Sequence, residues 1–250
     1  MPLRLLVITA HPDDESGAFG GALLMAHRDG AETSLLCLTD GQAAHFRGGV
    51  EDNAELGRKR RAELDAACRV LGVTRHEVLH YPDGELARQD FYQLTGEIVA
   101  RIRAWRPHVV LTFGGDGAVN LHRDHTAVSS AATAAFHWAG RPEFFPEQGL
   151  APSAPQKLYY SSPPFVSVRG RPELSETAAT VPYSLTLDPG SLIDRKWEAF
   201  AKHSSQAGVL DRVKSEIAKH FATERYLLVA ARGEISVSSD TGLFAGVVAD

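Results

Sequence analysis

The first 140 residues alternate between short apolar runs and longer segments with helical periodicity. Continuous apolar runs are typical of parallel strands that are buried on both faces, and apolar residues three or four apart are typical of helices. The expected strands are 5–8, 33–38, 77–81 and 108–113, and the expected helices are about 16–29, 53–71, 91–105 and 124–138. This alternation predicts an α/β fold, with a mostly parallel sheet flanked by helices and connected by right-handed crossovers.

The second part of the chain carries more loop signals than the first. Residues 140–190 are rich in proline and contain short candidate strands such as 158–161. Asp188 followed by Pro189 is typical of a helix start, so we expect a helix from there to about residue 204 and another around 210–221. Because no repeat or linker interrupts the sequence, we expect a single domain over residues 1–250 with a loop-rich C-terminal part.

The composition narrows the class of protein. Lys and Arg number 26 and Asp and Glu 31, and the formal net charge of −5 argues against a protein that coats nucleic acid or an anionic membrane. Cys37 and Cys68 lie in apolar segments, so we expect both to be buried and reduced. No apolar run approaches the roughly 20 residues that a membrane-spanning helix needs, and the N-terminus is typical of a first strand rather than a signal peptide. We therefore expect a cytoplasmic protein.

Acids, histidines and glycines follow every one of the first four predicted strands. In open α/β sheets, ligands bind outside the carboxyl ends of the strands, so these residues are expected at one edge of the sheet. The segments are Ala10–Glu15, Thr39-Asp40-Gly41, Pro82-Asp83-Gly84 and 114–125. A structural protein needs glycine turns at such positions, but it does not need two clusters of His and Asp.

The two His/Asp clusters predict a metal site. His11 and Asp14 are three residues apart in a turn, and either His122 or His125 would complete two histidines and one carboxylate, which leaves open positions as catalytic sites do. Zinc is the preferred ion and Fe(II) is the alternative. Asp13 is then placed to act as a general base, although it could instead cap the helix that follows. The competing interpretation is that both clusters are only turns.

Five motifs carry a resemblance to a known family. They are AHPDDE after the first strand, GRKRRAELDAACRVLGV, YPDGEL, TFGGDGAVNLHRDH after the fourth strand, and KWEAFAKHSSQ near the end. Together they span most of residues 4–206 and resemble the LmbE-like/PIG-L family of metal-dependent N-deacetylases. The resemblance implies a Rossmann-like fold and a hydrolase that removes an N-acetyl group from an N-acetylglucosamine-type substrate.

The resemblance also implies roles for individual residues. His11, Asp14 and His125 match the zinc ligands of the family. Asp13 matches the general base that deprotonates the attacking water. His122 matches the histidine that polarises the amide oxygen or stabilises the oxyanion, and we expect it to do so in its protonated form. Either protonated Asp13 or His122 would then give a proton to the leaving amine.

Three further residues are expected to bind substrate. Arg60 matches an arginine that reaches the substrate in the family, and it lies in the apolar stripe of its helix, where a charge must snorkel, pair with an acid or face a cleft. Asp40 and Asp116 follow the second and fourth strands. Arg123 departs from the family, which often has proline there, and could add positive charge near the entrance. Whether His45, Arg47 and His203 contact substrate stays open.

Two alternatives to a sugar deacetylase also stay open. The chain could be an amidase of sugar-thiol S-conjugates or a deacetylase of an antibiotic intermediate, which changes the substrate but not the reaction. It could also be a Rossmann-like module that binds a sugar or nucleotide without turnover, although its glycines form only a weak phosphate-binding pattern. A homo-oligomer is an open possibility.

Overall fold

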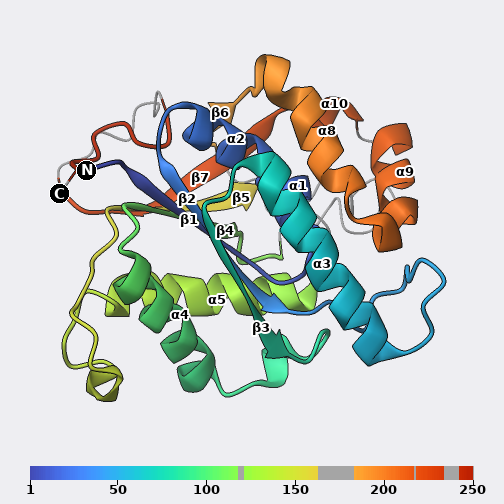
Figure 1. Cartoon of the computed structure of the whole chain (residues 1–250). Coiled ribbons are helices and arrows are strands. Elements are labelled where there is room, and N and C mark those ends of the chain that lie inside the picture. The colour runs from blue at the N-terminus through green and yellow to red at the C-terminus, as the bar shows by residue number, and fades with distance from the viewer. Residues whose placement is uncertain (118–120, 163–182, 217, 234–241, 250) are drawn as a thin grey trace.

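The computed structural model describes residues 1–117, 121–162, 183–216, 218–233 and 242–249. Within them, seven strands form one sheet that is flanked by helices on both faces (Figure 1). The strands are β1 (Arg4–Thr9), β2 (Glu32–Thr39), β3 (Arg75–Tyr81), β4 (Val109–Phe113), β5 (Lys157–Ser162), β6 (Leu185–Leu187) and β7 (Glu224–Ala231). Their order across the sheet is β3-β2-β1-β4-β5-β7-β6.

The helices form two layers, one on each face of this sheet (Figure 1). The α-helices are α1 (Asp14–Gly17), α2 (Gly20–Arg28), α3 (Asn53–Leu71), α4 (Phe91–Trp105), α5 (Arg123–Trp138), α8 (Ile193–Ala201), α9 (Ala207–Glu216) and α10 (Ala218–Phe221). The 3-10 helices are η1 (Leu86–Arg88), η3 (Pro146–Gln148), η4 (Gly190–Leu192) and η5 (Ser204–Gln206). Helices α4 and α5 pack together on one face, and α2, α3 and α8 pack together on the other.

The centre of the sheet is parallel, as the apolar runs predicted. β1 pairs in parallel with both β2 and β4, so that Val7 lies between Leu35 and Leu111. All three side chains are completely buried, because helices cover both faces. The α/β class and the mostly parallel sheet are therefore confirmed, and the loops after β1 and β4 must meet at one edge.

Helix boundaries follow local signals where those are strong. Asp52 caps α3 by accepting from the N–H of Glu55 at 2.8 Å, and Gly72 ends it in the left-handed conformation at φ 74°. Asp90 caps α4 by accepting from the N–H of Gln93 at 2.7 Å. These contacts explain why both predicted helices are found with nearly the expected bounds.

The expectation of one helix over residues 16–29 is wrong, because the structure has the short α1 and then α2. Between them the fully buried Phe19 inserts into the core, with its ring 5.3 Å from that of Phe113. α2 then begins at a close contact, where a Cβ on Gly21 would lie 2.9 Å from the Glu224 carboxylate. The absence of a side chain at Gly21 leaves room for that acid, and Gly20 lies against the side chain of Lys196 in the same way.

Two antiparallel strands complete the sheet beyond the parallel part. β7 pairs antiparallel with β5 on one side and with β6 on the other, and neither β6 nor β7 was predicted from the sequence. Cys37 and Cys68 are buried free thiols, as expected. Among the described residues, no helix combines the length and apolar character that a membrane crossing requires.

Candidate active site

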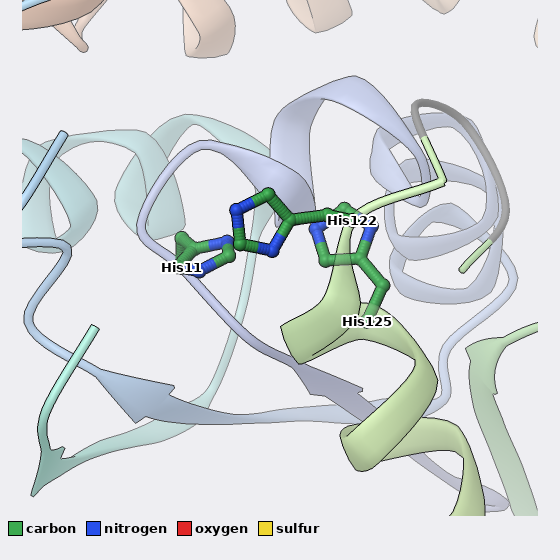
Figure 2. Close-up of side chains that lie close together, drawn as sticks. All are labelled: His11, His122 and His125. Atoms are coloured by element: carbon green, nitrogen blue, oxygen red, sulfur yellow. The ribbon is translucent and has the colours of Figure 1, made fainter. Parts of the chain in front are cut away.

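Three histidines meet at the carboxyl edge of the sheet. His11 lies in the loop after β1, and His122 and His125 lie at the start of α5, directly after the β4 loop (Figure 2). The ring centroid of His11 is 4.7 Å from that of His122 and 5.4 Å from that of His125. The parallel pairing of β1 with β4 therefore joins the two predicted clusters.

Asp14 lies between two of these histidines. Its Oδ2 accepts from the backbone N–H of His11 at 2.8 Å and lies 3.6 Å from the Nδ1 of that ring. Its Oδ1 lies 3.2 Å from the Nε2 of His125. One carboxylate thus contacts both of the histidines that the sequence predicted as its partners.

The ring nitrogens of His125 have different environments. Nδ1 donates to the carbonyl of Gly117 at 3.0 Å, and the ring stacks on Phe113 with 3.9 Å between centroids. Nε2 is buried, faces Asp14, and has no hydrogen-bond partner among the described residues. A buried nitrogen lone pair without a donor is costly unless a further group binds it, and a metal ion would do so.

Two acids hold the other side of the His11 ring. Nε2 of His11 lies 3.0 Å from Oδ1 of Asp83 and 3.3 Å from Oδ2 of Asp124. Nε2–H therefore donates to carboxylates while Nδ1 lies on the Asp14 side. Carboxylates on the remote nitrogen of a metal-binding histidine fix its tautomer and orientation.

The geometry permits more than one set of metal ligands. Donor atoms of His11, His122 and His125 lie within 4.8 Å of one another, and so do those of His11, Asp83 and Asp124. The predicted set of His11, Asp14 and His125 is linked through the two Asp14 contacts. The structure brings the predicted ligands together, and it also brings His122, Asp83 and Asp124 close to them.

The histidines and carboxylates of this cluster stabilise each other's charged forms. Burial alone would lower the pKa of His11, but hydrogen bonds that its ring donates to the carboxylates of Asp124, Asp14 and Asp83 outweigh burial and raise that pKa well above its usual value. Burial alone would raise the pKa of Asp14, but His125 and His11 lower it well below the usual range. The site is therefore electrostatically suited to a cation.

Asp13 adjoins this cluster in an unusual backbone conformation. Its φ is 118° and its ψ is −24°, in a region that residues other than glycine rarely adopt. Oδ2 of its carboxylate lies 3.2 Å from Nη2 of Arg60. Burial, partly offset by Arg60 and strengthened by Asp14, raises the pKa of Asp13 to about 6. A carboxyl group with that pKa can exchange protons near neutral pH.

His122 is held with one ring nitrogen facing the backbone. Nδ1 accepts from the N–H of Asp124 at 3.1 Å, so that His122 caps α5 and the proton of the neutral ring belongs on Nε2. Burial, together with the neighbouring His11 and His125, lowers the pKa of His122. The neutral ring is thus favoured, whereas the sequence-derived mechanism assumed a protonated one.

The three residues expected to bind substrate lie in different surroundings. Arg60 is only 3% exposed and donates to the carbonyls of Gly41 and Pro12 as well as to Asp13. Asp40 pairs with Nη1 of Arg61 at 2.7 Å and with His80 at 3.1 Å. Asp116 is exposed at the β4 loop.

The sequence left open whether His45, Arg47 and His203 contact substrate, and the structure shows what surrounds each of them. Arg47 donates to the carbonyls of Val50 and Glu51 in its own loop, and His45 is exposed in the same loop. His203 is buried and contacts Glu15, with 2.7 Å between Nε2 and Oε1.

Sequence reasoning gave no role to Asp83 or Asp124. Asp124 is fully buried, and besides contacting His11 it accepts from the N–H groups of Gly84 at 2.7 Å and Leu86 at 3.1 Å. The signal was present, since these acids belong to the Pro-Asp-Gly turn and the His-x-Asp-His motif. The sequence did not show that Asp83 and Asp124 both contact the ring of His11.

Known proteins resemble this chain over nearly its whole length. A deacetylase of 1D-myo-inositol 2-acetamido-2-deoxy-alpha-D-glucopyranoside from Rhodococcus jostii is 31% identical over 98% of both chains. A mycothiol S-conjugate amidase from Streptomyces coelicolor is 27% identical over 98% of this chain and 97% of its own. Among solved structures, the conserved protein TT1542 from Thermus thermophilus matches with a TM-score of 0.72 at 25% identity, covering 93% of this chain and 97% of that one.

The family assignment rests on the part of the chain that contains the site. The PIG-L family model, described as GlcNAc-PI de-N-acetylase, matches residues 6–136, which include His11, Asp14 and His125. This range holds most of β1, all of β2, β3 and β4, and most of α5, and the candidate site is built from the loops and helix ends among them. The chain belongs to the PIG-L family, and its fold is the LmbE-like fold that the five motifs predicted.

Proposed function

We propose that this protein is a metal-dependent hydrolase that removes the N-acetyl group from an N-acetylglucosamine-type substrate. One observation carries the proposal: the half-buried Asp13, with a pKa raised to about 6, adjoins a set of two histidines and one carboxylate in which a buried nitrogen of His125 has no hydrogen-bond partner among the described residues. A general base beside open metal positions is what hydrolysis of an amide requires.

His11, Asp14 and His125 are proposed as the metal ligands. Nδ1 of His11, the Asp14 carboxylate and Nε2 of His125 are the donors, because the other nitrogen of each ring already donates to protein oxygens. This donor set suits zinc and also Fe(II). When bound, such an ion supplies a Lewis acid and lowers the pKa of a water to about 7.

Asp13 and His122 are proposed to carry the proton transfers. Asp13 accepts the proton of the attacking water, for which its carboxyl must be ionised at the start of the reaction. The neutral ring of His122 donates from Nε2 to the developing oxyanion, as its Nδ1 already accepts from the backbone. The proton held by Asp13 then passes to the leaving amine, so that acetate and a free amine are the products.

The substrate-binding roles of Asp40 and Asp116 remain predictions. Asp116 is exposed at the β4 loop, where its carboxylate could accept from sugar hydroxyls. The guanidinium of Arg60 is occupied by Asp13 and two carbonyls, and we therefore propose that it acts on the reaction through Asp13.

The proposal is tested by measuring the reaction products of the protein with and without bound metal. Purified protein would be stripped with a chelator, reloaded with zinc or Fe(II), and incubated with 1D-myo-inositol 2-acetamido-2-deoxy-alpha-D-glucopyranoside. We expect release of acetate and a primary amine in equal amounts by the reloaded protein and almost none by the stripped protein. Absence of product with either metal would overturn the proposal for this substrate class.

An amidase of thiol S-conjugates is the second candidate, and the near full-length similarity to the Streptomyces coelicolor amidase supports it. Assays of a mycothiol S-conjugate beside the acetylated sugar, at equal concentrations, compare the two through kcat/KM. A binding module without turnover is the third interpretation. It predicts binding of the sugar by calorimetry with no acetate released after metal loading.

A further inference from the structure

The backbone of Asp13 has to be held in place by its surroundings. At φ 118° its side chain crowds its own backbone, and such a conformation persists only where the surrounding structure holds it. Asp13 stands at the start of α1, where its carbonyl accepts from the N–H groups of Ser16 at 3.2 Å and Gly17 at 2.9 Å. Those two bonds fix the carbonyl side of the residue only.

Glu15 fixes the N–H side of the same residue. Its Oε2 accepts from the N–H of Asp13 at 2.9 Å. Its Oε1 accepts from the hydroxyl of Ser16 at 2.6 Å and from Nε2 of His203 at 2.7 Å. The Glu15 side chain is completely buried, so a carboxylate that would otherwise be solvated is directed toward the Asp13 backbone.

His203 reaches Glu15 from a distant part of the chain. It follows α8, 188 residues after Glu15, and is 1% exposed. The segment after it is anchored by Glu63, whose carboxylate accepts from the hydroxyls of Ser204 at 2.7 Å and Ser205 at 2.6 Å. The chain directly after His203 is therefore held by Glu63, and the His203 ring reaches Glu15 from this anchored segment.

We propose that the buried Glu15–His203 pair is a positioning device, which holds the backbone of Asp13 in its strained conformation and so directs the Asp13 carboxylate at the attacking water. Neither member acts on the substrate in this scheme, and the inference rests on the proposed function. A purely structural pair would join α1 to the C-terminal helices and affect stability alone.

The main test replaces the donor on His203. His203→Ala removes the bond to Oε1 of Glu15, while His203→Gln can offer an amide N–H from a similar position. We expect His203→Ala to lower kcat about 10- to 100-fold, as a misdirected base does, with KM changed less than about twofold. Bound metal per chain should stay unchanged, and His203→Gln should restore most of kcat.

Arg103→Lys serves as a matched control for a general loss of stability. Arg103 is 4% exposed near the end of α4, at the opposite edge of the sheet, and donates to backbone carbonyls around η3. We expect a lower Tm for this variant with kcat per folded molecule unchanged. If His203→Ala behaves in the same way, or if His203→Gln rescues nothing, the inference is wrong.

A structural readout separates this inference from the proposed function. If the wild-type protein hydrolyses no acetamide, the proposed function fails. The crystal structures of wild type and His203→Gln should even then keep φ of Asp13 positive, and Glu15→Ala should lose it, because alanine offers no side-chain acceptor to the Asp13 N–H. An unchanged Asp13 backbone in Glu15→Ala would overturn the inference, including where His203→Ala does not fold.

Discussion

The guanidinium of Arg60 contacts the carboxylate of Asp13, with 3.2 Å between Nη2 and Oδ2, while Arg60 itself is 3% exposed. The guanidinium also donates to the carbonyls of Gly41 and Pro12, which hold it beside the candidate base. Burial raises the pKa of Asp13, and Arg60 opposes that rise. Arg60 thus favours the ionised form of Asp13, which is the form that can act as a base.

Substitution of Arg60 should move the acid limb of the pH profile. In wild type, kcat/KM should fall as the pH drops below about 6, because protonated Asp13 cannot accept a proton. Arg60→Gln removes the cation that favours the ionised form, so the limb should shift to higher pH. Arg69→Gln, an exposed position on the same helix, is the control and should leave the limb unchanged. A shift to lower pH in Arg60→Gln would contradict the assignment.

Asp13→Asn tests the base itself. The amide has the same shape but cannot accept the proton of the water, so we expect kcat to fall about 10²- to 10⁴-fold. Metal content should stay at the wild-type level, because the ligands proposed are His11, Asp14 and His125. Retention of full turnover by this variant would show that another group is the base.

The roles of His122 and His125 can be told apart by metal analysis. His125→Ala removes the buried Nε2, which has no hydrogen-bond partner within the described part of the chain, so we expect loss of most bound metal. His122→Ala should keep the metal and lose activity, since Nδ1 of that ring faces the backbone. Metal measured per chain by elemental analysis, alongside kcat, decides between them. Loss of metal in both variants would favour the set of three histidines.

Asp124 is expected to influence metal binding through His11. Asp124→Asn weakens the carboxylate that accepts from Nε2 of His11, and such changes lower metal affinity about 10- to 100-fold. Competition with a metal-binding dye measures that affinity. Asp65→Asn is a suitable comparison, because Asp65 pairs with His76 on a half-exposed surface and should leave the affinity unchanged.

Lys196 and Glu224 are expected to control stability rather than chemistry. Lys196 is 1% exposed and its Nζ lies 2.7 Å from Oε1 of Glu224, which also accepts from the N–H groups of Gly21 and Ala22. Lys196→Met leaves that carboxylate buried without its cation, and we expect a loss of about 3–5 kcal/mol in the free energy of unfolding. Urea denaturation measures it. Loss of the exposed Arg28–Asp29 pair should give no measurable change.

The amino-acid sequence by itself determined the parallel half of the fold and the edge that carries the site. Apolar runs such as Leu5–Ile8 and capping residues such as Asp52 and Asp90 act over a few neighbours, so their effect is readable locally. The carboxyl ends of parallel strands share one edge of the sheet, so the sequence alone predicted that His11 and His125 lie close together.

Tertiary structure alone decided what surrounds those residues. β7 forms by pairing with β5, which lies more than 60 residues earlier in the chain. Arg60 meets Asp13, and His203 meets Glu15, because separate elements bury these charges in one place. A buried charge must find an opposite partner, yet the sequence shows only that a partner is needed, since partners are chosen by the packing of the whole chain.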